Sequence, residues 1–239
     1  MIPKVIHYCW FGGNEKSRAM LNCIESWKRL CPDYEIIEWN EESFDVECIP
    51  FIKEAYRAKK WAFVSDYARL KIIYENGGIY LDTDVELIKP LDEFLQLHGY
   101  MGFQKDDQIN TGLGFGAEKG HKMLWALMED YHNRAFPENI DDCKDIACPI
   151  INTEVLIKHG LVREEKKQSF EGLTVFPREY FDPKDCETYA LNVTDNTYSI
   201  HHYDATWKTR NPKLRQGIIK FVASVIGKEN YIRLKNFIK

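Results

Sequence analysis

The sequence lacks several features that would assign it to a broad class at once. It contains no run of 18 apolar residues and therefore no predicted transmembrane helix. Met1 to Lys4 lead directly into a strand-like run, so no signal peptide is expected. None of its seven cysteines forms a Cys-x-x-Cys pair, which argues against a zinc site or a disulfide framework and favours free thiols in a reducing cytoplasm.

Two further absences limit the possible ligands. The net charge of −5 argues against general nucleic-acid binding. Neither G-x-G-x-x-G nor a Walker pattern follows the first apolar run, so Gly12 and Gly13 are weak evidence for a phosphate loop. Their position after a predicted strand still favours close approach of the backbone to a ligand.

What remains is typical of one globular domain of 239 residues, with 44% hydrophobic and 29% charged residues. The hydrophobic periods alternate between those of strands and helices, which predicts an α/β fold with a ligand at the strand ends. Strands are expected at 3–11, 34–39, 79–81, 100–103, 109–117 and 172–177, and helices at 15–31, 51–60, 62–76, 91–97, 121–133 and 150–159.

The segment 62–86 carries the strongest pattern. Apolar residues at three- and four-residue spacing predict a helix, on which Asp66 and Arg69 lie on one face. Gly77 and Gly78 end that helix. A short apolar strand then leads to Asp82-Thr83-Asp84, and the period of two in an extended chain predicts that both carboxylates point the same way.

Paired carboxylates repel each other unless a cation lies between them, so Asp82 and Asp84 predict a Mg²⁺ or Mn²⁺ site whose other ligands are phosphate oxygens. Two alternatives stay open for the motif alone. It is often only a solvated turn, and haloacid-dehalogenase-like phosphatases also carry Asp-x-Asp after a strand. In those enzymes the motif lies on the first strand with a threonine nearby, whereas here Val85 and Glu86 follow it.

The run SDYARLKIIYENGGIYLDTDVE resembles the DXD region of glycosyltransferase family 32. That family includes bacterial capsular polysaccharide sugar transferases and yeast initiating mannosyltransferases, and it is related to the glucosylating domain of large clostridial toxins. The resemblance implies a GT-A-like, Rossmann-type domain that uses a nucleotide sugar, with UDP as the expected nucleotide, and Mn²⁺ or Mg²⁺. It also implies retention of anomeric configuration, by attack from the side on which the diphosphate leaves.

The resemblance also implies roles for the residues of the motif. Asp84 would bind the metal directly, and Asp82 would bind the ribose, or the metal through water. Asp66 and Arg69 would hold sugar hydroxyls, with Arg69 also near the phosphates. A structural ion pair between Asp66 and Arg69 is the alternative.

Further site residues follow from the same resemblance. Trp10, in Ile-His-x-x-Trp, would stack on the nucleotide base, and Asn110 would lie along the donor sugar unless it only caps a turn. His201, His202 and Trp207 match a His-His-x-x-x-x-Trp segment that closes the site, where the toxins have an acidic residue and a hydroxyl. The strand period lets only one histidine face the metal, and His202 is the expected one. The nucleotide-sugar site is thus expected to contain Trp10, Asp66, Arg69, Tyr80, Asp82, Asn110 and Trp207.

The charge is unevenly distributed between residues 1–207, expected to be the transferase domain, and the tail 208–239. The tail has nine Lys and Arg against one acidic residue, or +8, which leaves 23 basic and 36 acidic residues, or −13, in the domain. Its apolar residues alternate with the basic ones, which predicts a helix that either binds an anionic membrane surface or packs on the domain.

We therefore expect a transferase that builds capsular polysaccharide or lipopolysaccharide on a lipid-linked acceptor, cytoplasmic or peripheral on the inner face of the plasma membrane. A degenerate subunit that only binds nucleotide sugar is the alternative. The donor sugar and the oligomeric state stay open.

Overall fold

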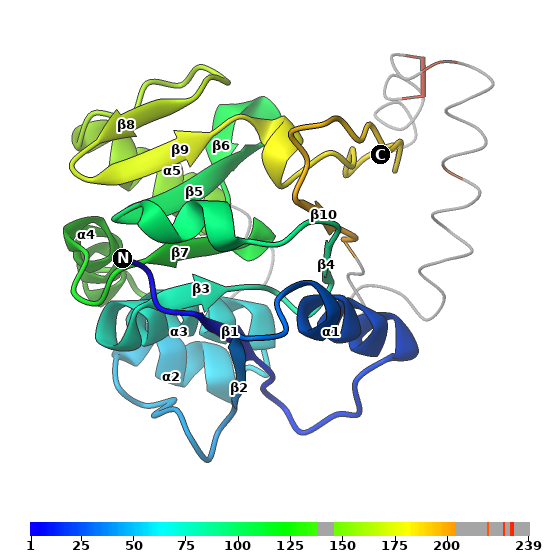
Figure 1. Cartoon of the computed structure of the whole chain (residues 1–239). Coiled ribbons are helices and arrows are strands. Elements are labelled where there is room, and N and C mark those ends of the chain that lie inside the picture. Colours follow the sequence, from blue (N-terminus) through cyan, green and yellow to red (C-terminus); the bar gives the residue numbers. More distant parts are fainter. Residues whose placement is uncertain (138–145, 204–218, 220–226, 228–229, 232–239) are drawn as a thin grey trace.

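The computed structural model describes residues 1–137, 146–203, 219, 227 and 230–231. A central sheet runs in the order β2-β1-β3-β7-β5-β9-β8, with β6 added beside β5 (Figure 1). Its strands are β1 (Val5–Cys9), β2 (Glu35–Trp39), β3 (Gly78–Tyr80), β5 (Gly99–Gln104), β6 (Gln108–Ile109), β7 (Phe115–Ala117), β8 (Gln168–Phe170) and β9 (Leu173–Phe176).

The directions of the strands bring several loops together at one edge of this sheet, the edge formed by the carboxyl ends of β1, β2 and β3. β1 pairs in parallel with both β2 and β3, so the residues that follow these three strands emerge at the same edge. β7 is antiparallel to β3, which brings the residues just before β7 to that edge as well. The crevice outside the carboxyl ends of parallel strands is where α/β sheets bind ligands.

Helices cover both faces of the sheet, as the expected α/β alternation requires. One core cluster joins the sheet to four helices, and a second joins the opposite face to the first helix and a 3₁₀ turn. The elements are α1 (Arg18–Leu30), α2 (Pro50–Arg57), α3 (Trp61–Asn76), α4 (Lys122–His132), α5 (Cys148–Lys158) and η1 (Asp92–Gln96).

A second, two-stranded sheet lies beside the first (Figure 1). It pairs β4 (Val85–Leu87) with β10 (Ser199–His201) in antiparallel register. Helix α1 holds β4 in place, because Trp27 Nε1 donates to the Val85 carbonyl at 2.7 Å and the Leu87 N–H donates to Ser26 Oγ at 2.9 Å. The Asp-x-Asp segment therefore connects the two sheets.

The structure differs from the sequence-based expectation at three places. The stretch 109–117 is not one strand but β6, a 3₁₀ turn η3 (Thr111–Leu113) and β7, because the Asn110 side chain accepts the Gly112 N–H and turns the chain. Residues 82–85 form a turn, closed by the Val85 N–H to the Asp82 carbonyl at 3.0 Å, rather than an extended strand. Strand β8 lies where no strand was expected.

The predicted amphipathic helix of the tail, and with it the domain boundary at 207, falls outside the described residues apart from four single positions. Within the described part of the chain, no helix is both long and apolar enough to span a membrane. The six cysteines of that part are free, in agreement with the absence of a disulfide pattern.

A buried histidine joins β1, β2 and the end of α3. The Nδ1 atom of His7 on β1 accepts from Trp39 Nε1 on β2 at 3.0 Å, and its Nε2 lies 3.1 Å from the Gly77 carbonyl at the end of α3. Gly78 has φ 104°, and a Cβ there would lie 3.0 Å from His7 Nε2. Burial lowers the pKa of His7 to about 4, so the imidazole is neutral and donates only from Nε2.

We predict that His7→Gln removes a pH-dependent part of the stability. Because the pKa of His7 is lowered on folding, its contribution is complete above about pH 6.5 and is lost as the pH falls toward about 4. The shift corresponds to roughly 3 kcal/mol in the free energy of unfolding. Denaturant unfolding at pH 7 and pH 4.5 measures it, with exposed His159→Gln as control. Parallel pH dependences for wild type and His7→Gln would contradict the assignment.

Candidate active site

The centre of the candidate site is a buried guanidinium between two carboxylates. The Arg69 side chain is 4% exposed, and its Nη2 lies 3.0 Å from Asp66 Oδ1 and 3.3 Å from Asp82 Oδ1. Asp66 and Arg69 are one turn apart on α3, and Asp82 follows β3. Arg69 thus links the helix to the end of the strand. In this structure Asp66 and Arg69 form the ion pair that the sequence left open as the alternative, and Asp82 of the DXD motif takes part in it.

Arg69 contacts residues from three further places in the chain. Its Nε donates to the Ser65 carbonyl at 3.1 Å, and its Nη1 lies 3.4 Å from Thr111 Oγ1 and 3.8 Å from Cys148 Sγ. Its guanidinium also lies 5.1 Å from the ring centre of Tyr80, a cation–π arrangement. These contacts join α3, β3, η3 and the first residue of α5.

Burial and charge act on this centre in opposite directions. Burial raises the pKa of Asp66 to about 6, although Arg69 lowers it, and burial likewise raises the pKa of Asp82. Burial alone would lower the pKa of Arg69, but the charges of Asp82 and Asp66 hold it well above its usual range. Arg69 therefore stays cationic, and Asp66 loses its charge at a higher pH than an exposed carboxylate does, near pH 6.

The second half of the site lies on the small sheet. His201 on β10 places Nε2 3.1 Å from Asp84 Oδ1. One ligand atom from each of Asp82, Asp84 and His201 lies within 4.8 Å of the others, and these three form a possible metal-binding group among the described residues. Burial lowers the pKa of His201, but the charge and hydrogen bond of Asp84, together with the charges of Asp82 and Asp182, outweigh it, so the pKa is raised. Both carboxylates of the motif therefore converge, although they lie on a turn.

The structure places His201, not the expected His202, beside the carboxylates. Antiparallel pairing sets His201 opposite Val85 and Ile200 opposite Glu86. The next side chain, His202, points away and pairs with Glu86 at 2.8 Å. The expectation that one histidine alone faces the carboxylates agrees with this geometry, and the choice of His202 is corrected because the register was not visible in the sequence.

Asn110 and Gly112 form another side of the site. Asn110 is 7% exposed; its Oδ1 accepts the Gly112 N–H at 2.7 Å and its Nδ2 donates to Gln104 at 2.9 Å. In the structure described it caps a turn, the alternative left open by the sequence. A Cβ at Gly112 would lie 2.6 Å from Asp82 Oδ2 and 3.1 Å from Arg69 Nη1, so glycine allows the backbone to approach the charged centre.

Tyr80 and Trp10 each donate a side-chain hydrogen bond to a nearby residue. The Tyr80 hydroxyl donates to Asp82 Oδ1 at 2.9 Å, and the residue is 1% exposed. Trp10 Nε1 donates to the Asn14 carbonyl at 2.6 Å, while the Lys16 ammonium lies 5.3 Å from its ring centre. Trp207 lies outside the described residues.

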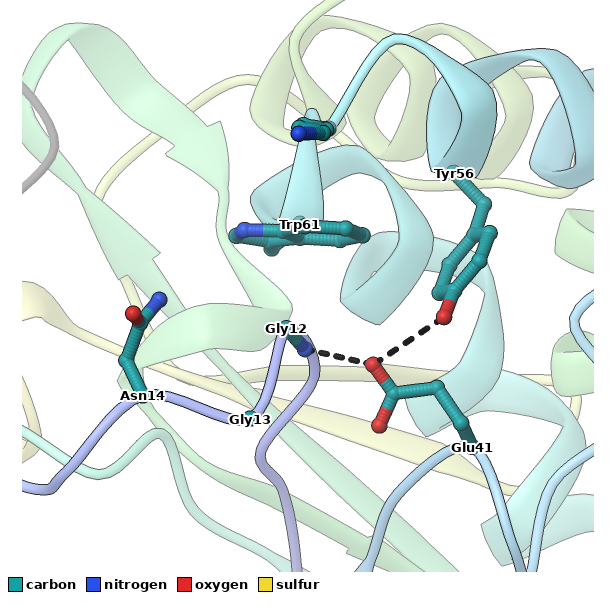
Figure 2. Close-up of a pocket in the computed structure, with 7 residues that line it drawn as sticks. Gly12, Gly13, Asn14, Glu41, Tyr56 and Trp61 are labelled. Atoms are coloured by element: carbon teal, nitrogen blue, oxygen red, sulfur yellow. Dashed lines mark hydrogen bonds between the residues drawn. The ribbon is translucent and has the colours of Figure 1, made fainter.

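A hollow of about 540 Å³ opens beside the end of β1, and Trp61 rather than Trp10 lines it. Figure 2 shows the Trp61 ring above Gly12, with Glu41 reaching toward Tyr56. The Glu41 carboxylate accepts the Gly12 N–H at 2.5 Å and the Tyr56 hydroxyl at 3.3 Å. The hollow is lined by Gly12, Gly13, Asn14, Glu41, Tyr56, Lys59 and Trp61.

Sequence patterns did not predict several residues of the charged centre around Arg69 and of the hollow beside β1. Trp61 begins the helix that carries Asp66, but nothing in its local sequence distinguishes it from a core tryptophan. Cys148 is buried, and burial raises the pKa of its thiol, so it lies beside Arg69 as a neutral thiol. No spacing rule connects Cys148 to Arg69, because only the fold brings the first residue of α5 beside Arg69.

A family model described as a glycosyltransferase sugar-binding region containing the DXD motif matches residues 17–99. The comparisons confirm the resemblance to glycosyltransferase family 32. Inositol phosphoceramide mannosyltransferase 3 of Schizosaccharomyces pombe is 31% identical over 139 residues, which cover 56% of this chain and 38% of the relative. Human alpha-1,4-N-acetylglucosaminyltransferase is 31% identical over 105 residues, 44% of this chain and 26% of the relative. The chain thus spans well under half of these curated relatives.

Solved structures support the fold. The PaToxG glycosyltransferase superposes with a TM-score of 0.50 at 19% identity, over 66% of this chain and 68% of its own. The expected GT-A-like α/β fold is confirmed.

We predict that Arg69→Met destabilises the fold by about 3–5 kcal/mol at pH 7, because it leaves the buried Asp66 and the partly exposed Asp82 without their cation. The loss should be smaller at pH 5, because burial raises the pKa of both carboxylates and each therefore loses its charge more readily as the pH falls. Denaturant unfolding at both pH values measures it. Arg57→Met removes an exposed pair with Glu54 and should cost at most about 1 kcal/mol. A loss from Arg69→Met as small as this control would show that the centre does not depend on its charge.

Proposed function

We propose that this protein is a metal-dependent, retaining glycosyltransferase that moves a sugar from a nucleotide sugar to a glycan acceptor. The observation that carries the proposal is the convergence of Asp82, Asp84 and His201 beside the buried Arg69. The family match over residues 17–99 supports a sugar donor at this motif. Neither feature by itself specifies the donor.

The donor set suits a divalent cation. Two carboxylates and one imidazole are ligands that Mn²⁺ accepts, and Mg²⁺ is bound by carboxylates and phosphate oxygens. Asp84 and His201 would bind the ion directly. Asp82 Oδ1 already accepts from Tyr80 and lies beside Arg69, which favours an indirect or shared contact for Asp82. When bound, the cation neutralises charge on the leaving diphosphate.

The chain's own residues supply the remaining electrostatics. Arg69 is a fixed cation that would stabilise the charge developing on the leaving group, and its burial strengthens that interaction. Asp66 would accept hydrogen bonds from sugar hydroxyls while it is ionised. We further propose that the acceptor attacks from the face on which the diphosphate departs, as the resemblance to family 32 implies.

The hollow beside β1 is our proposed nucleoside site. It follows the carboxyl end of β1, and Cys9, the last residue of β1, has its thiol against the Tyr80 hydroxyl next to Asp82. Trp61 supplies an aromatic wall and Glu41 a hydrogen-bond acceptor. Trp10, which precedes Gly12 and Gly13, stays a candidate for the wall opposite Trp61.

The donor and acceptor are proposed more narrowly from the resemblance. We propose a UDP-linked sugar as donor and a lipid-linked surface polysaccharide, capsular or lipopolysaccharide, as acceptor. Peripheral contact of a cytoplasmic enzyme with the inner membrane through residues 208–239 stays a prediction, which rests on the charge of that segment.

We predict that Asp84→Asn abolishes metal-dependent turnover and leaves the melting temperature near that of wild type. His201→Asn should weaken Mn²⁺ binding much more than His202→Asn, because only His201 faces Asp84. Release of UDP from UDP-glucose, UDP-galactose and their N-acetyl forms, with Mn²⁺ or with a chelator, measures turnover. A fully active Asp84→Asn protein would refute the metal assignment.

The same donor titration separates the alternatives. Slow hydrolysis of one donor only with metal supports the transferase and names the sugar. If all four donors are inert, binding of UDP and GDP distinguishes a GDP-linked donor from a protein that needs its acceptor. Tight UDP binding without turnover, even with acceptor, would indicate a nucleotide-sugar-binding subunit.

We predict that Trp61→Ala raises the dissociation constant of UDP about 5- to 150-fold, because stacking of a base on an aromatic ring contributes about 1–3 kcal/mol. Calorimetry with UDP and Mn²⁺ measures this. Trp125→Ala is the matched control, since Trp125 lies on α4, is 46% exposed and does not line the hollow. Equal UDP affinity in wild type and Trp61→Ala would place the base elsewhere.

A further inference from the structure

We propose that Tyr203 is a positioning residue, held by a buried pair of Asp182 and Arg178, that orients the His201 imidazole toward Asp84. The proposal rests on the metal site proposed above. It assigns a role in that site to the segment between β9 and β10, which no sequence motif singled out.

His201 lacks the usual anchor of a metal-binding imidazole. Such a histidine normally donates its second ring N–H to a carboxylate, a carbonyl or water, which fixes the direction of the binding nitrogen. Here Nε2 faces Asp84, while Nδ1 is buried and has no hydrogen-bond partner among the described residues. The ring must therefore be oriented by packing.

The Tyr203 ring supplies that packing. It lies against the His201 ring with centroids 4.2 Å apart and planes at 50°. Tyr203 has φ 56°, in the left-handed region that side chains other than glycine seldom adopt, so the chain turns sharply after His202 and brings the tyrosine back onto His201. This contact between neighbours in the sequence depends on that turn.

The Tyr203 ring is itself anchored at its far end. Its hydroxyl donates to Asp182 Oδ1 at 2.6 Å, and Asp182 is fully buried. The other carboxylate oxygen accepts from Arg178 Nε at 2.8 Å, and the same Nε lies 3.0 Å from the Asp182 carbonyl. A buried, charge-assisted pair of this kind holds its atoms in a narrow range of positions. It therefore fixes Tyr203.

The backbone between His201 and Tyr203 is held by the same segment. Arg178 Nη2 donates to the Lys184 carbonyl at 3.0 Å, and Lys184 Nζ donates to the His202 carbonyl at 2.7 Å. The His202 N–H donates to the Asp84 carbonyl at 3.0 Å. The main chain beside His201 and the ring that packs on it thus both depend on Arg178, Asp182 and Lys184.

The test is the substitution Tyr203→Phe in the full chain. It keeps the ring and removes the hydrogen bond to Asp182. We expect a 10- to 100-fold weaker Mn²⁺ affinity, the range found when residues that orient metal ligands are changed. Electron paramagnetic resonance of free Mn²⁺ during titration measures the affinity without activity. UDP binding in the absence of metal should stay unchanged.

Two further variants make the test specific. Tyr198 lies on the same segment, and its hydroxyl donates to Glu93 of η1, away from the site. Tyr198→Phe should therefore leave Mn²⁺ affinity at the wild-type value. In a His201→Asn background, Tyr203→Phe should have no additional effect, because Tyr203 acts through His201.

Each other outcome overturns one specific statement. If wild type does not bind Mn²⁺, the proposed metal site fails. If wild type binds it and Tyr203→Phe binds it equally well, the positioning role fails. Two results would show instead that Tyr203 has a general structural role: Tyr203→Phe also weakens Mn²⁺ binding in the His201→Asn background, or it weakens metal-free UDP binding to the same extent as Mn²⁺ binding. Either result would overturn the positioning role.

Discussion

The arrangement of the site depends on burying one guanidinium between two carboxylates. Removing Arg69 and Asp66 almost wholly from water, and Asp82 in part, is costly, and their mutual attraction offsets that cost only while all three keep their geometry. The helix α3, the turn after β3, the 3₁₀ turn before β7 and the start of α5 each place an atom beside Arg69. These four segments are therefore fixed relative to one another before any ligand binds.

The other half of the site is built differently. Asp84 directly precedes β4 and His201 ends β10 of the two-stranded sheet, which α1 supports from one side and the segment 178–203 from the other. Asp82 and Asp84 are thus held by separate sets of contacts, although one residue separates them. The distance between the two halves sets the space for a cation. Electrostatic stabilisation of a leaving group is most effective when charges are placed in advance in this way.

The proposed nucleoside site and the charged centre share the helix α3. Trp61 at its first turn lines the hollow, and Asp66 and Arg69 lie one to two turns further along. Gly12 permits the close approach of Trp61, because a Cβ there would lie 2.6 Å from the indole. A donor that spans both places would contact a base pocket and a charge cluster whose separation is set by one rigid helix.

Local sequence determined the central part of this protein. The apolar stripe of α3, the Gly77–Gly78 stop, the short strand and the order Asp66, Arg69, Asp82, Asp84 are all visible in the chain, because helix period and glycine conformation act over a few residues. The register between β4 and β10, by contrast, is set by contacts between distant parts of the chain. It placed His201 rather than His202 beside Asp84. The break of 109–117 into β6, η3 and β7, the Trp61 hollow and the contact of Cys148 with Arg69 were likewise decided only by the tertiary structure. Such contacts join residues far apart in the chain, and no local spacing encodes them.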